Sequence, residues 1–585
     1  MDTHASRALA LDLSASSSRN PNTVSGTSPT ATSTATMLTL AAASPVGTVV
    51  RLLAVLLSLV LLTSNLLVNR ASAQEATPAW IHLEDGQELA DKQEITVGVN
   101  RYLVNGEEDF WFAHASLQVW EPLIDYDDNF NLVPGLAKSW ELSPDGLTWT
   151  FYLRDDVTFS NGEQYNADSL IGSIAHAKAS SGRPSLYLGG INFEEIYGDP
   201  VVTRVDDYTV SLSYKEPRPL LPYAISNHYS AQFWQGQFDE NSNFTGLPIG
   251  TGPFKVTDWK RDQYIVLERN ENYWKEKPTL TKITVRTYPD ENSRLSALKA
   301  GEVDALVELG AVLPAQAGEI SGDSNYVVQH FPTACNTYLL FNGTKAPFND
   351  VRVRQALSLA IDRDAFVKDL LYGYGIPAKS VLLAADSTFF NDDPAQQIQY
   401  DPEKAKQLLN EATGGQRVKV ELLFNPPGQN LLGWPYPLIA TYLQAILQPV
   451  GFDVTLKQQE SAAVTETLKE GSYDVAISNS CWATGDPNYI LRRTLGADSA
   501  IQKTNHGGYN NPEVEKLLDE AKVETDQAKQ VELYKQVQAI GNAEVPIAPL
   551  FDQETIIASR PYVQGLTQHI AYAPSFETIY ILKHD

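Results

Sequence analysis

Residues 336–544 alternate between segments typical of strands and segments typical of helices, and this pattern constrains the fold more than any other feature of the chain. Val418–Phe424 and Phe452–Leu456 have the apolar and β-branched content of strands. Helical segments precede and follow them. The alternation predicts an α/β domain with a partly parallel sheet.

Three helices in this region have recognisable starts. Asp350 can cap a segment whose apolar residues recur on one stripe, with a spacing of about 3.6 residues. Asp401-Pro402-Glu403 and Asn511-Pro512-Glu513 each place proline at the first helical position, where the amide is unpaired in any case. Gly414 is predicted to end the second helix. The stripe after Asp350 consists of Val353, Leu357, Ile361 and Leu371.

Two further elements are predicted nearer the N-terminus. Glu94–Asn100 reads as a strand with Ile95, Val97 and Val99 on one face. Trp140–Leu153 places Ser-Pro-Asp-Gly between two alternating runs, which predicts a β-hairpin.

The composition excludes several classes of function. The chain carries 44 Lys and Arg against 71 Asp and Glu, a net charge of −27 over 585 residues. Such an acidic protein is a poor partner for nucleic acids and anionic membrane surfaces. Cys335 and Cys481 are its only cysteines, so neither a disulfide framework nor a four-cysteine zinc site is available.

Residues 1–73 read as a leader followed by a signal peptide. Leu52–Leu62 is apolar, follows Arg51, and precedes Ala71-Ser72-Ala73, a site where a signal peptidase could cut before Gln74. A membrane anchor is the alternative, but polar residues interrupt the apolar stretch before it reaches about 20 residues. No cysteine follows for a lipid anchor, and Met37 is a second possible start of translation. We expect a protein that works outside the cytoplasm, in the periplasm or at the cell surface.

No catalytic or nucleotide-binding motif stands out. The chain has no G-x-x-x-x-G-K-[ST] loop, no G-x-S-x-G elbow and no H-E-x-x-H pair. The segment G-Y-G-I-P-A at Gly373 lacks the third glycine of a dinucleotide loop and has Pro377 where a helix would begin. We therefore expect no enzyme activity, no cofactor and no metal. The many carboxylates leave a secreted hydrolase open as an alternative.

Several segments, spread over nearly the whole chain after the signal, resemble the family 5 extracellular solute-binding proteins, the peptide, oligosaccharide and nickel-chelate receptors of bacterial ABC importers. Their order and spacing are similar to the family's, and their residues are mostly those of turns and helix starts. They are EPLIDYDDNFNLVPGLAKSWELSPDGLTWTFYLRDDVTFSNGEQYNADSL from Glu121, GTGPFKVTDW from Gly250, RNENYW from Arg269, YPDENSRLSALKAGEVDAL from Tyr288, LLFNGTKAPFNDVRVRQALSLAIDR from Leu339, YDPEKAKQLLNEA from Tyr400 and YNNPEVEKLLDEA from Tyr509.

The resemblance implies an α/β, two-lobed periplasmic-binding-protein-like fold (class II, large cluster C type) with an extra inserted domain. Lobe I would comprise residues 94–120, 250–334 and 550–585, lobe II residues 336–544, and the inserted domain residues 121–249. In GTGPF, glycine would supply the backbone freedom of a tight turn. Ligand would be buried between the lobes by hinge closure.

The resemblance also implies where ligand binds. The loop after the strand from Tyr473 should set specificity, with Trp482 as an aromatic wall. In peptide-binding relatives an aspartate after this tryptophan holds the ligand's ammonium group, whereas here Asp486 matches a later Asp-Pro turn. That departure argues against a peptide, and the absence of histidine from the loop argues against a nickel chelate. Further candidate walls are Trp434, Tyr436 and Trp111, and candidate hydrogen-bonding residues are Asn336, Tyr338 and Ser480.

Cys335 and Cys481 would lie near the lobe boundary and the cleft strand of such a fold. In an oxidising compartment we expect a disulfide between them, with two buried thiols as the alternative.

We therefore predict a monomeric protein that captures an oligopeptide or oligosaccharide and delivers it to ABC transporter permease subunits, with no nucleic-acid partner. The alternatives are a secreted carbohydrate-active hydrolase and a ligand sensor that transports nothing. The choice between peptide and sugar stays open.

Overall fold

The chain folds around one large sheet, and two of its strands run through both halves of that sheet. The structure, a computed structural model, describes residues 78–101, 103, 118–127, 131–180, 193–226, 245–383, 388–426, 433–481, 485–569 and 573–584. Met1–Thr77 and Pro78–Asp585 are separate units, and the predicted leader, signal peptide and alternative start lie outside the described residues. Within the described ranges, no helix is long and apolar enough to cross a membrane.

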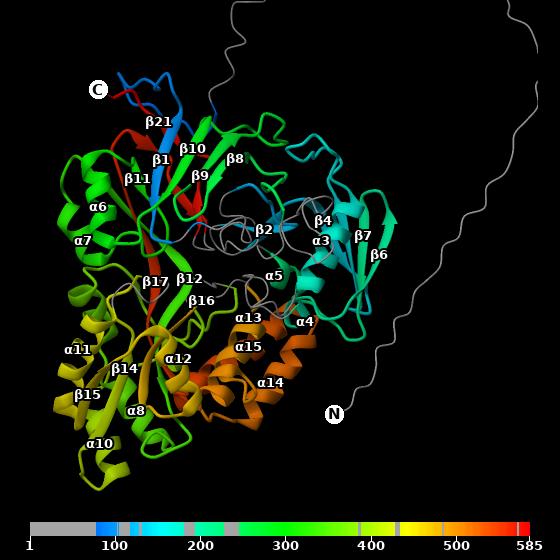
Figure 1. The fold of residues 1–585 in the computed structure, drawn as a ribbon. Coiled ribbons are helices and arrows are strands. Elements are labelled where there is room, and N and C mark those ends of the chain that lie inside the picture. Colours follow the sequence, from blue (N-terminus) through cyan, green and yellow to red (C-terminus); the bar gives the residue numbers. More distant parts are fainter. Residues whose placement is uncertain are drawn as a thin grey trace, which may run out of the picture. The chain divides into compact units, whose positions relative to one another are not determined.

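The large sheet has eleven strands in the order β15-β14-β16-β12-β17-β11-β1-β10-β9-β8, with β13 paired to β17 (Figure 1). Its strands are β1 (Glu94–Val99), β8 (Phe254–Lys260), β9 (Tyr264–Arg269), β10 (Lys282–Thr287), β11 (Ala305–Leu306), β12 (Val327–Phe341), β13 (Ile376–Pro377), β14 (Val418–Phe424), β15 (Phe452–Gln458), β16 (Val475–Cys481) and β17 (Ile547–Ser559).

We call β1 and β8–β11 the first half of this sheet and β14–β16 the second half. In the first half β1 lies parallel to β10 and β11, and in the second half β14 lies parallel to β15 and β16. The predictions of strands at residues 94–100, 418–424 and 452–456, and of a partly parallel sheet, are confirmed.

The strands β12 and β17 run antiparallel through both halves. Val327–Pro332 pairs with Glu554–Ser559, and β16 joins β12 only from Cys335 onward. Between Pro332 and Asn336 the register shifts, so three residues of β12 lie opposite one residue of β17. A bulge of this kind bends a strand pair and increases its local twist. The bend lies at the boundary between the first half and the second half of the sheet.

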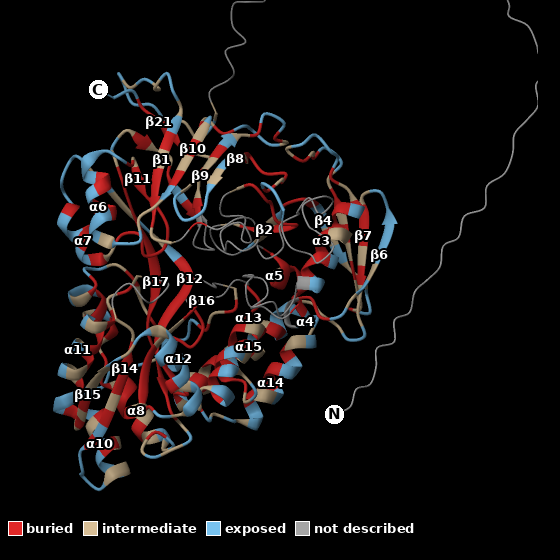
Figure 2. Ribbon diagram, in the orientation of Figure 1, coloured by how far each residue is buried: buried red, intermediate tan, exposed pale blue. Residues whose placement is uncertain are grey.

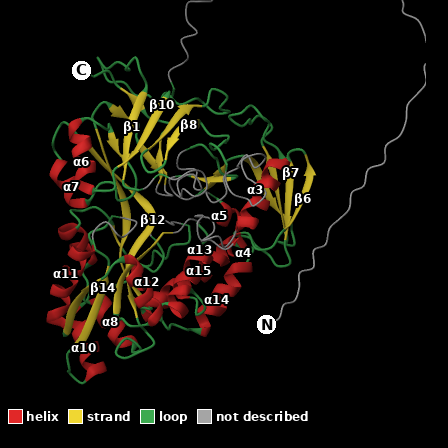
Figure 3. Cartoon of the chain, viewed as in Figure 1, coloured by secondary structure: helices red, strands yellow, loops and turns green. Residues whose placement is uncertain are grey.

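Helices cover the sheet in both halves (Figure 3). Beside the first half lie α6 (Glu291–Ala300) and α7 (Pro314–Ile320). With the second half lie α8 (Val351–Leu359), α9 (Arg363–Ala365), α10 (Pro402–Thr413), α11 (Tyr436–Leu447), α12 (Ser461–Glu470), α13 (Pro487–Leu495), α14 (Pro512–Val523) and α15 (Gln527–Glu544). Figure 2 shows β12 and β17 buried along most of their lengths, and every residue of β17 is buried.

The predicted helix starts are confirmed. The Asp350 carboxylate accepts a hydrogen bond from the Arg352 amide, Asp401 from the Lys404 amide and Asn511 from the Glu513 amide. These side chains pair backbone donors that the first turn of a helix leaves open. Gly414 ends α10 in the left-handed conformation, as predicted.

The helix after Asp350 is shorter than its apolar stripe predicts. It ends at Leu359, and Asp362 caps the next helical turn by accepting from the Ala365 amide. Ile361 lies between the two helices, yet it is fully buried. Only Val353 and Leu357 of the stripe lie in α8, and Leu371 lies beyond α9, so buried residues inside and outside a helix imitate the periodicity of one long helix.

Residues 124–225 contain a second, smaller sheet with the strand order β4-β5-β7-β6. The hairpin predicted for residues 140–153 is formed by β4 (Ala137–Leu142) and β5 (Thr148–Leu153). The sheet has its own apolar cluster, which includes Phe151, Leu153 and Val210. The other elements of this region are β2 (Ile124–Tyr126), β3 (Leu132–Pro134), α3 (Ala167–Ser180), α4 (Phe193–Ile196), β6 (Val201–Asp206), β7 (Thr209–Ser213) and α5 (Leu221–Ile225). Near the C-terminus lie β18 (Val563–Gln564), β19 (Thr567–His569), β20 (Ala573–Ser575) and β21 (Tyr580–Ile581).

The GTGPF segment needs its glycines for a reason other than the predicted one. Neither Gly250 nor Gly252 has a positive φ. A Cβ on Gly250 would lie 1.9 Å from the Val119 carbonyl oxygen, and one on Gly252 would lie 2.2 Å from that of Gln118. The close approach of two backbones, rather than a special turn conformation, excludes a side chain here.

Candidate functional site

The candidate ligand site lies at the carboxyl ends of the parallel strands. In open α/β sheets, ligands bind outside the carboxyl ends of parallel strands. In the first half β1, β10 and β11 end at Val99, Thr287 and Leu306; in the second half β14, β15 and β16 end at Phe424, Gln458 and Cys481. Segments following these ends from both halves come into contact.

That contact is between Gly310, which follows β11, and Gly433, which precedes α11. A Cβ on Gly433 would lie 2.9 Å from the Gly310 carbonyl oxygen and 3.0 Å from its Cα. Both glycines have a positive φ, 77° and 70°. The carboxyl ends of the two halves therefore face one another.

A buried ion pair lies at this edge of the first half. The Arg101 Nε lies 2.9 Å from Glu308 Oε1, and the Glu308 side chain is 6% exposed. Glu308 has φ 108°, a conformation that costs a side-chain-bearing residue energy and that is common at functional sites. Sequence reasoning missed both residues, because neither lies in a recognisable motif.

The three predicted hydrogen-bonding residues share one face of the β16-β12-β17 ladder. Asn336 lies opposite Ser480, and Tyr338 lies opposite Ser478. The Tyr338 hydroxyl is 3.2 Å from the Ser480 Oγ. Asn336 is 1% exposed, and its Oδ1 has no hydrogen-bond partner among the residues that the structure describes. A buried acceptor without a donor is costly, so this oxygen is suited to a donor from a bound molecule.

Asp552 joins the same face and was missed by sequence reasoning. It lies opposite Asn336 in the β12–β17 ladder and is 2% exposed. A signal was available, because Asp552–Thr555 is a run of four polar residues inside the apolar segment 547–559. Polar residues kept in a buried strand are informative in a way that exposed ones are not.

Trp434 and Tyr436 lie on the other face of the ladder. The Trp434 ring packs against Phe551 with centroids 4.7 Å apart, and the Tyr436 hydroxyl accepts a hydrogen bond of 2.6 Å from Asn479 Nδ2. Both side chains are at most 3% exposed and belong to the main apolar cluster. Burial raises the pKa of the Tyr436 hydroxyl. The structure therefore separates this pair from Asn336, Tyr338 and Ser480.

Cys335 and Cys481 form a disulfide at the open end of the β12–β16 ladder. The two residues are register partners with Cα atoms 4.0 Å apart. The next pair of the ladder is Asn336 with Ser480. The disulfide thus fixes the ends of two strands beside the candidate hydrogen-bonding residues.

Asp486 caps α13. Its Oδ1 accepts hydrogen bonds from the Asn488 amide at 2.8 Å and the Tyr489 amide at 3.3 Å. The residue is 8% exposed, and burial raises the pKa of its carboxyl to about 6. Just before it, the Gly485 amide donates to the Tyr126 hydroxyl, which itself donates to the Tyr223 carbonyl oxygen. Asp486 is therefore in part a structural residue.

Replacing Asp486 by asparagine should stabilise the protein at pH 7.5 by about 1 to 3 kcal/mol. The folded-state pKa of about 6 lies above the unfolded value of 3.8, so the contribution of this group is favourable below 3.8 and is lost as pH rises through 6. Asparagine carries no charge and caps helices as well as aspartate does.

The measurement is urea unfolding of both proteins at pH 7.5 and at pH 4, where the gain should largely vanish. An equal gain at both pH values would contradict a raised pKa at Asp486.

The two remaining predicted site residues, Trp111 and Trp482, lie outside the described residues.

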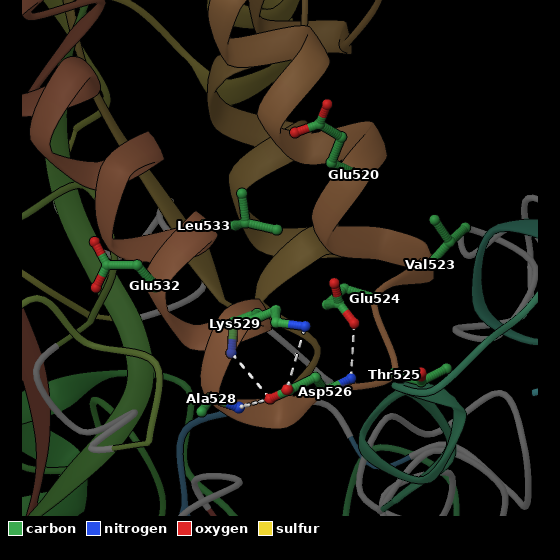
Figure 4. Close-up of a pocket in the computed structure, with 9 residues that line it drawn as sticks. All are labelled: Glu520, Val523, Glu524, Thr525, Asp526, Ala528, Lys529, Glu532 and Leu533. Carbon is green, nitrogen blue, oxygen red and sulfur yellow. Dashed lines mark hydrogen bonds and ion pairs between the residues drawn. The ribbon is translucent and has the colours of Figure 1, made fainter.

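Figure 4 shows a hollow at the turn between α14 and α15, and none of the predicted site residues lines it. Asp526 accepts hydrogen bonds from the Ala528 and Lys529 amides, and its own amide donates to Glu524 Oε1. These contacts complete the helix start, and the surplus of carboxylates alone does not indicate a ligand. The hollow is lined by Glu520, Val523, Glu524, Thr525, Asp526, Ala528, Lys529, Glu532 and Leu533.

Comparisons with known proteins agree on one family. The family model described as "Bacterial extracellular solute-binding proteins, family 5 Middle" matches residues 131–502. The chain is 28% identical over 536 residues to the "Nickel-binding periplasmic protein" of Escherichia coli (strain K12), covering 87% of this chain and 94% of that protein. It is also 28% identical over 491 residues to the "Peptide transport periplasmic protein SapA" of Salmonella typhimurium, covering 80% and 87%.

A solved structure of NikA from Brucella suis in complex with Fe(III)-EDTA superimposes with a TM-score of 0.71 at 26% identity, covering 83% of this chain and 99% of that one. The expected two-lobed α/β fold class is confirmed by this likeness.

Proposed function

The chain belongs to the bacterial extracellular solute-binding proteins of family 5, and on that premise we propose that it captures an oligopeptide or oligosaccharide between its two lobes and delivers it to the permease of an ABC importer. The protein works outside the cytoplasm, as the family's members do, and the signal peptide predicted before Gln74 would export it. Its relatives are named for binding and transport, and we propose that it likewise performs no catalysis.

The observation that carries this proposal is the contact of Gly310 with Gly433, which joins segments that follow the carboxyl ends of β11 and β14, strands in different halves. A solute held there would touch both halves and would hold them together. The free energy of ligand binding then stabilises the closed form relative to the open form.

The lobes would follow the halves of the large sheet. Lobe I would comprise residues 94–120, 250–334 and 550–585, and lobe II residues 336–544. The inserted domain would be residues 121–249, which is supported by a separate sheet and a separate apolar cluster in that region.

Two observations bear on the kind of solute. The Asn336 oxygen and the hydroxyls of Ser480 and Tyr338 suit a ligand that donates hydrogen bonds, such as a sugar hydroxyl or a peptide amide. Asp486 already accepts two backbone amides, which lowers its capacity to hold a peptide's ammonium group. The relatives include proteins named for nickel and for peptides, so nickel chelates and peptides are tested beside sugars in the first experiment.

Thermal unfolding of the purified protein against a ligand panel tests the proposal. After carried-over ligand is removed by partial denaturation, a true ligand at 100 times its Kd should stabilise the fold by about 2.7 kcal/mol and raise Tm by a few degrees. The panel contains di- to hexapeptides, cello- and xylo-oligosaccharides, and nickel chelates.

A shift with oligosaccharides alone supports the sugar proposal, and a shift with peptides alone means that another residue holds the ammonium group. Turnover of a chromogenic glycoside would instead favour the hydrolase.

A further inference from the structure

The segment Leu371–Ala378, called the strap below, leaves the second half, lies against the first half and returns. It contains the G-Y-G-I-P-A sequence that matches no nucleotide loop. Three of its residues have a positive φ, Tyr372, Gly373 and Gly375, at 57°, 85° and 116°. The chain therefore changes direction sharply along the strap, and two of these positions are glycines that tolerate such φ values.

Both ends of the strap are held in the second half. Leu371 is fully buried, and the helical turn before it contains Phe366, whose ring packs against Tyr442 of α11. After Ala378, the Val381 amide donates to Asn542 Oδ1 of α15 at 3.0 Å. The strap thus belongs by sequence and by its ends to the second half.

Its middle contacts the first half through two tyrosines. The Tyr372 ring lies on α7, since a Cβ on Gly318 would be 3.1 Å from it. The Tyr374 ring meets His330 of β12 edge-on, with centroids 5.5 Å apart. Tyr374 also packs against the apolar cluster formed by α6, α7 and β11. Neither tyrosine contact involves the second half's own helices.

Glu554 of β17 joins these contacts. Its Oε2 accepts a 2.6 Å hydrogen bond from the Gly375 amide, and its Oε1 lies 3.0 Å from His330 Nδ1. The side chain is 8% exposed. One buried carboxylate therefore connects the strap to the part of β12 that pairs with β17 but not with β16. Beyond it, Ile376 and Pro377 pair with Asp552 and Phe551 of β17.

We propose that the strap is a third connection between the lobes, beside β12 and β17, and that Glu554 is its positioning residue. Two adjacent strands alone permit both bending and twisting, particularly at a bulge. The contact of the strap with α7 is a third attachment, and it lies to one side of β12 and β17. It should oppose twisting of one lobe relative to the other, while the lobes can still open and close by bending at the strands and the strap. The inference rests on the proposed function only in equating this bending with ligand capture.

Hydrogen–deuterium exchange and small-angle X-ray scattering of the ligand-free protein test the proposal. In Glu554→Ala and in Tyr374→Ala, amide exchange in residues 371–378 should become about tenfold faster, because a buried hydrogen bond or ring contact is lost. The radius of gyration should also rise as the lobes separate. Glu554→Gln retains an acceptor for the Gly375 amide and should restore slow exchange and the wild-type radius.

Tyr400→Ala is the matched control, because this tyrosine of the second half is 53% exposed and lies outside the strap. It should change neither measurement. If either alanine variant fails to fold, Tyr372→Ala, at a residue 59% exposed, removes the α7 contact alone and should still raise the radius of gyration.

Faster exchange in the strap with an unchanged radius of gyration would overturn the proposal, since the strap would then be a surface loop without influence on the lobes. This result is independent of any ligand, so it can be told apart from failure of the proposed function.

Discussion

Replacing Cys335 and Cys481 together by alanine should lower the free energy of unfolding by about 4 to 5 kcal/mol. The disulfide closes a loop of 146 residues, and in the chain-entropy account a loop of this length restricts the unfolded chain strongly. The two alanines remove this restriction, while the β12–β16 ladder keeps its backbone hydrogen bonds.

The measurement is guanidinium unfolding of the wild type, the double variant, and the wild type reduced by a phosphine. The free energy of unfolding should fall by similar amounts in the double variant and in the reduced wild type. The double variant treated with the phosphine is the control for effects of the reductant itself. A loss below about 1 kcal/mol in both would contradict the loop-closure account and would indicate that the unfolded chain is already compact.

Local signals in the sequence predicted the local structure well. The starts of α8, α10 and α14 follow from one capping side chain each, and the hairpin of β4 and β5 follows from Ser-Pro-Asp-Gly between alternating runs. In each case the determining contact lies within four residues, so no knowledge of the tertiary structure is required.

Contacts between distant segments account for what the sequence could not predict. The stripe after Asp350 imitates one helix because residues of α8 and residues that follow it, Ile361 and Leu371, are buried in the same core. Positions 250 and 252 must be glycine because the carbonyl oxygens of residues 119 and 118, more than 100 positions away in the sequence, leave no room for a side chain. Neither cause can be read from the segment that carries the motif.

The candidate site shows the same division. The three residues placed on strands, Asn336, Tyr338 and Ser480, share a face because the alternation of a strand determines it. Trp434 and Tyr436 were chosen for their chemistry alone, and they pack into the main apolar cluster. Glu308 lies in no recognisable motif, and although Asp552 lies in a visible polar run, its place beside Asn336 depends on strand order, which is a property of the whole sheet.

The motifs that carry the family resemblance act mainly on the backbone. In RNENYW, Asn270 Nδ2 donates to the Gly252 carbonyl oxygen of GTGPF, and the Trp274 Nε1 donates to Glu121 at the start of another motif. In the motif from Leu339, Arg354 donates to the carbonyl oxygens of Glu544 and Val545, just before β17. Shared motifs of this kind identify a fold while leaving the ligand undetermined.

The last residue of that motif gives the second large expected effect. Arg363→Met should lower the free energy of unfolding by about 3 kcal/mol. The Arg363 guanidinium donates to the carbonyl oxygens of Pro549, Ser358 and Ile361, and it is 6% exposed. Burial lowers the pKa of this guanidinium to about 9, which reflects the cost of keeping it charged away from water. Methionine has a similar length, but it removes the side-chain donor from all three of these buried carbonyl oxygens.

Arg352→Met is the matched control, since Arg352 is 43% exposed and its main partner is the Asp350 carboxylate. Exposed pairs contribute at most about 1 kcal/mol, so this variant should unfold close to the wild type in urea. Pro549 lies in β17, the strand that runs through both halves of the sheet. Loss of the hydrogen bond from Arg363 should therefore also weaken the attachment of β17 to the segment that contains Arg363. Equal losses in the two variants would mean that Arg363 stabilises the fold only as a surface arginine does, and that its buried hydrogen bonds contribute nothing.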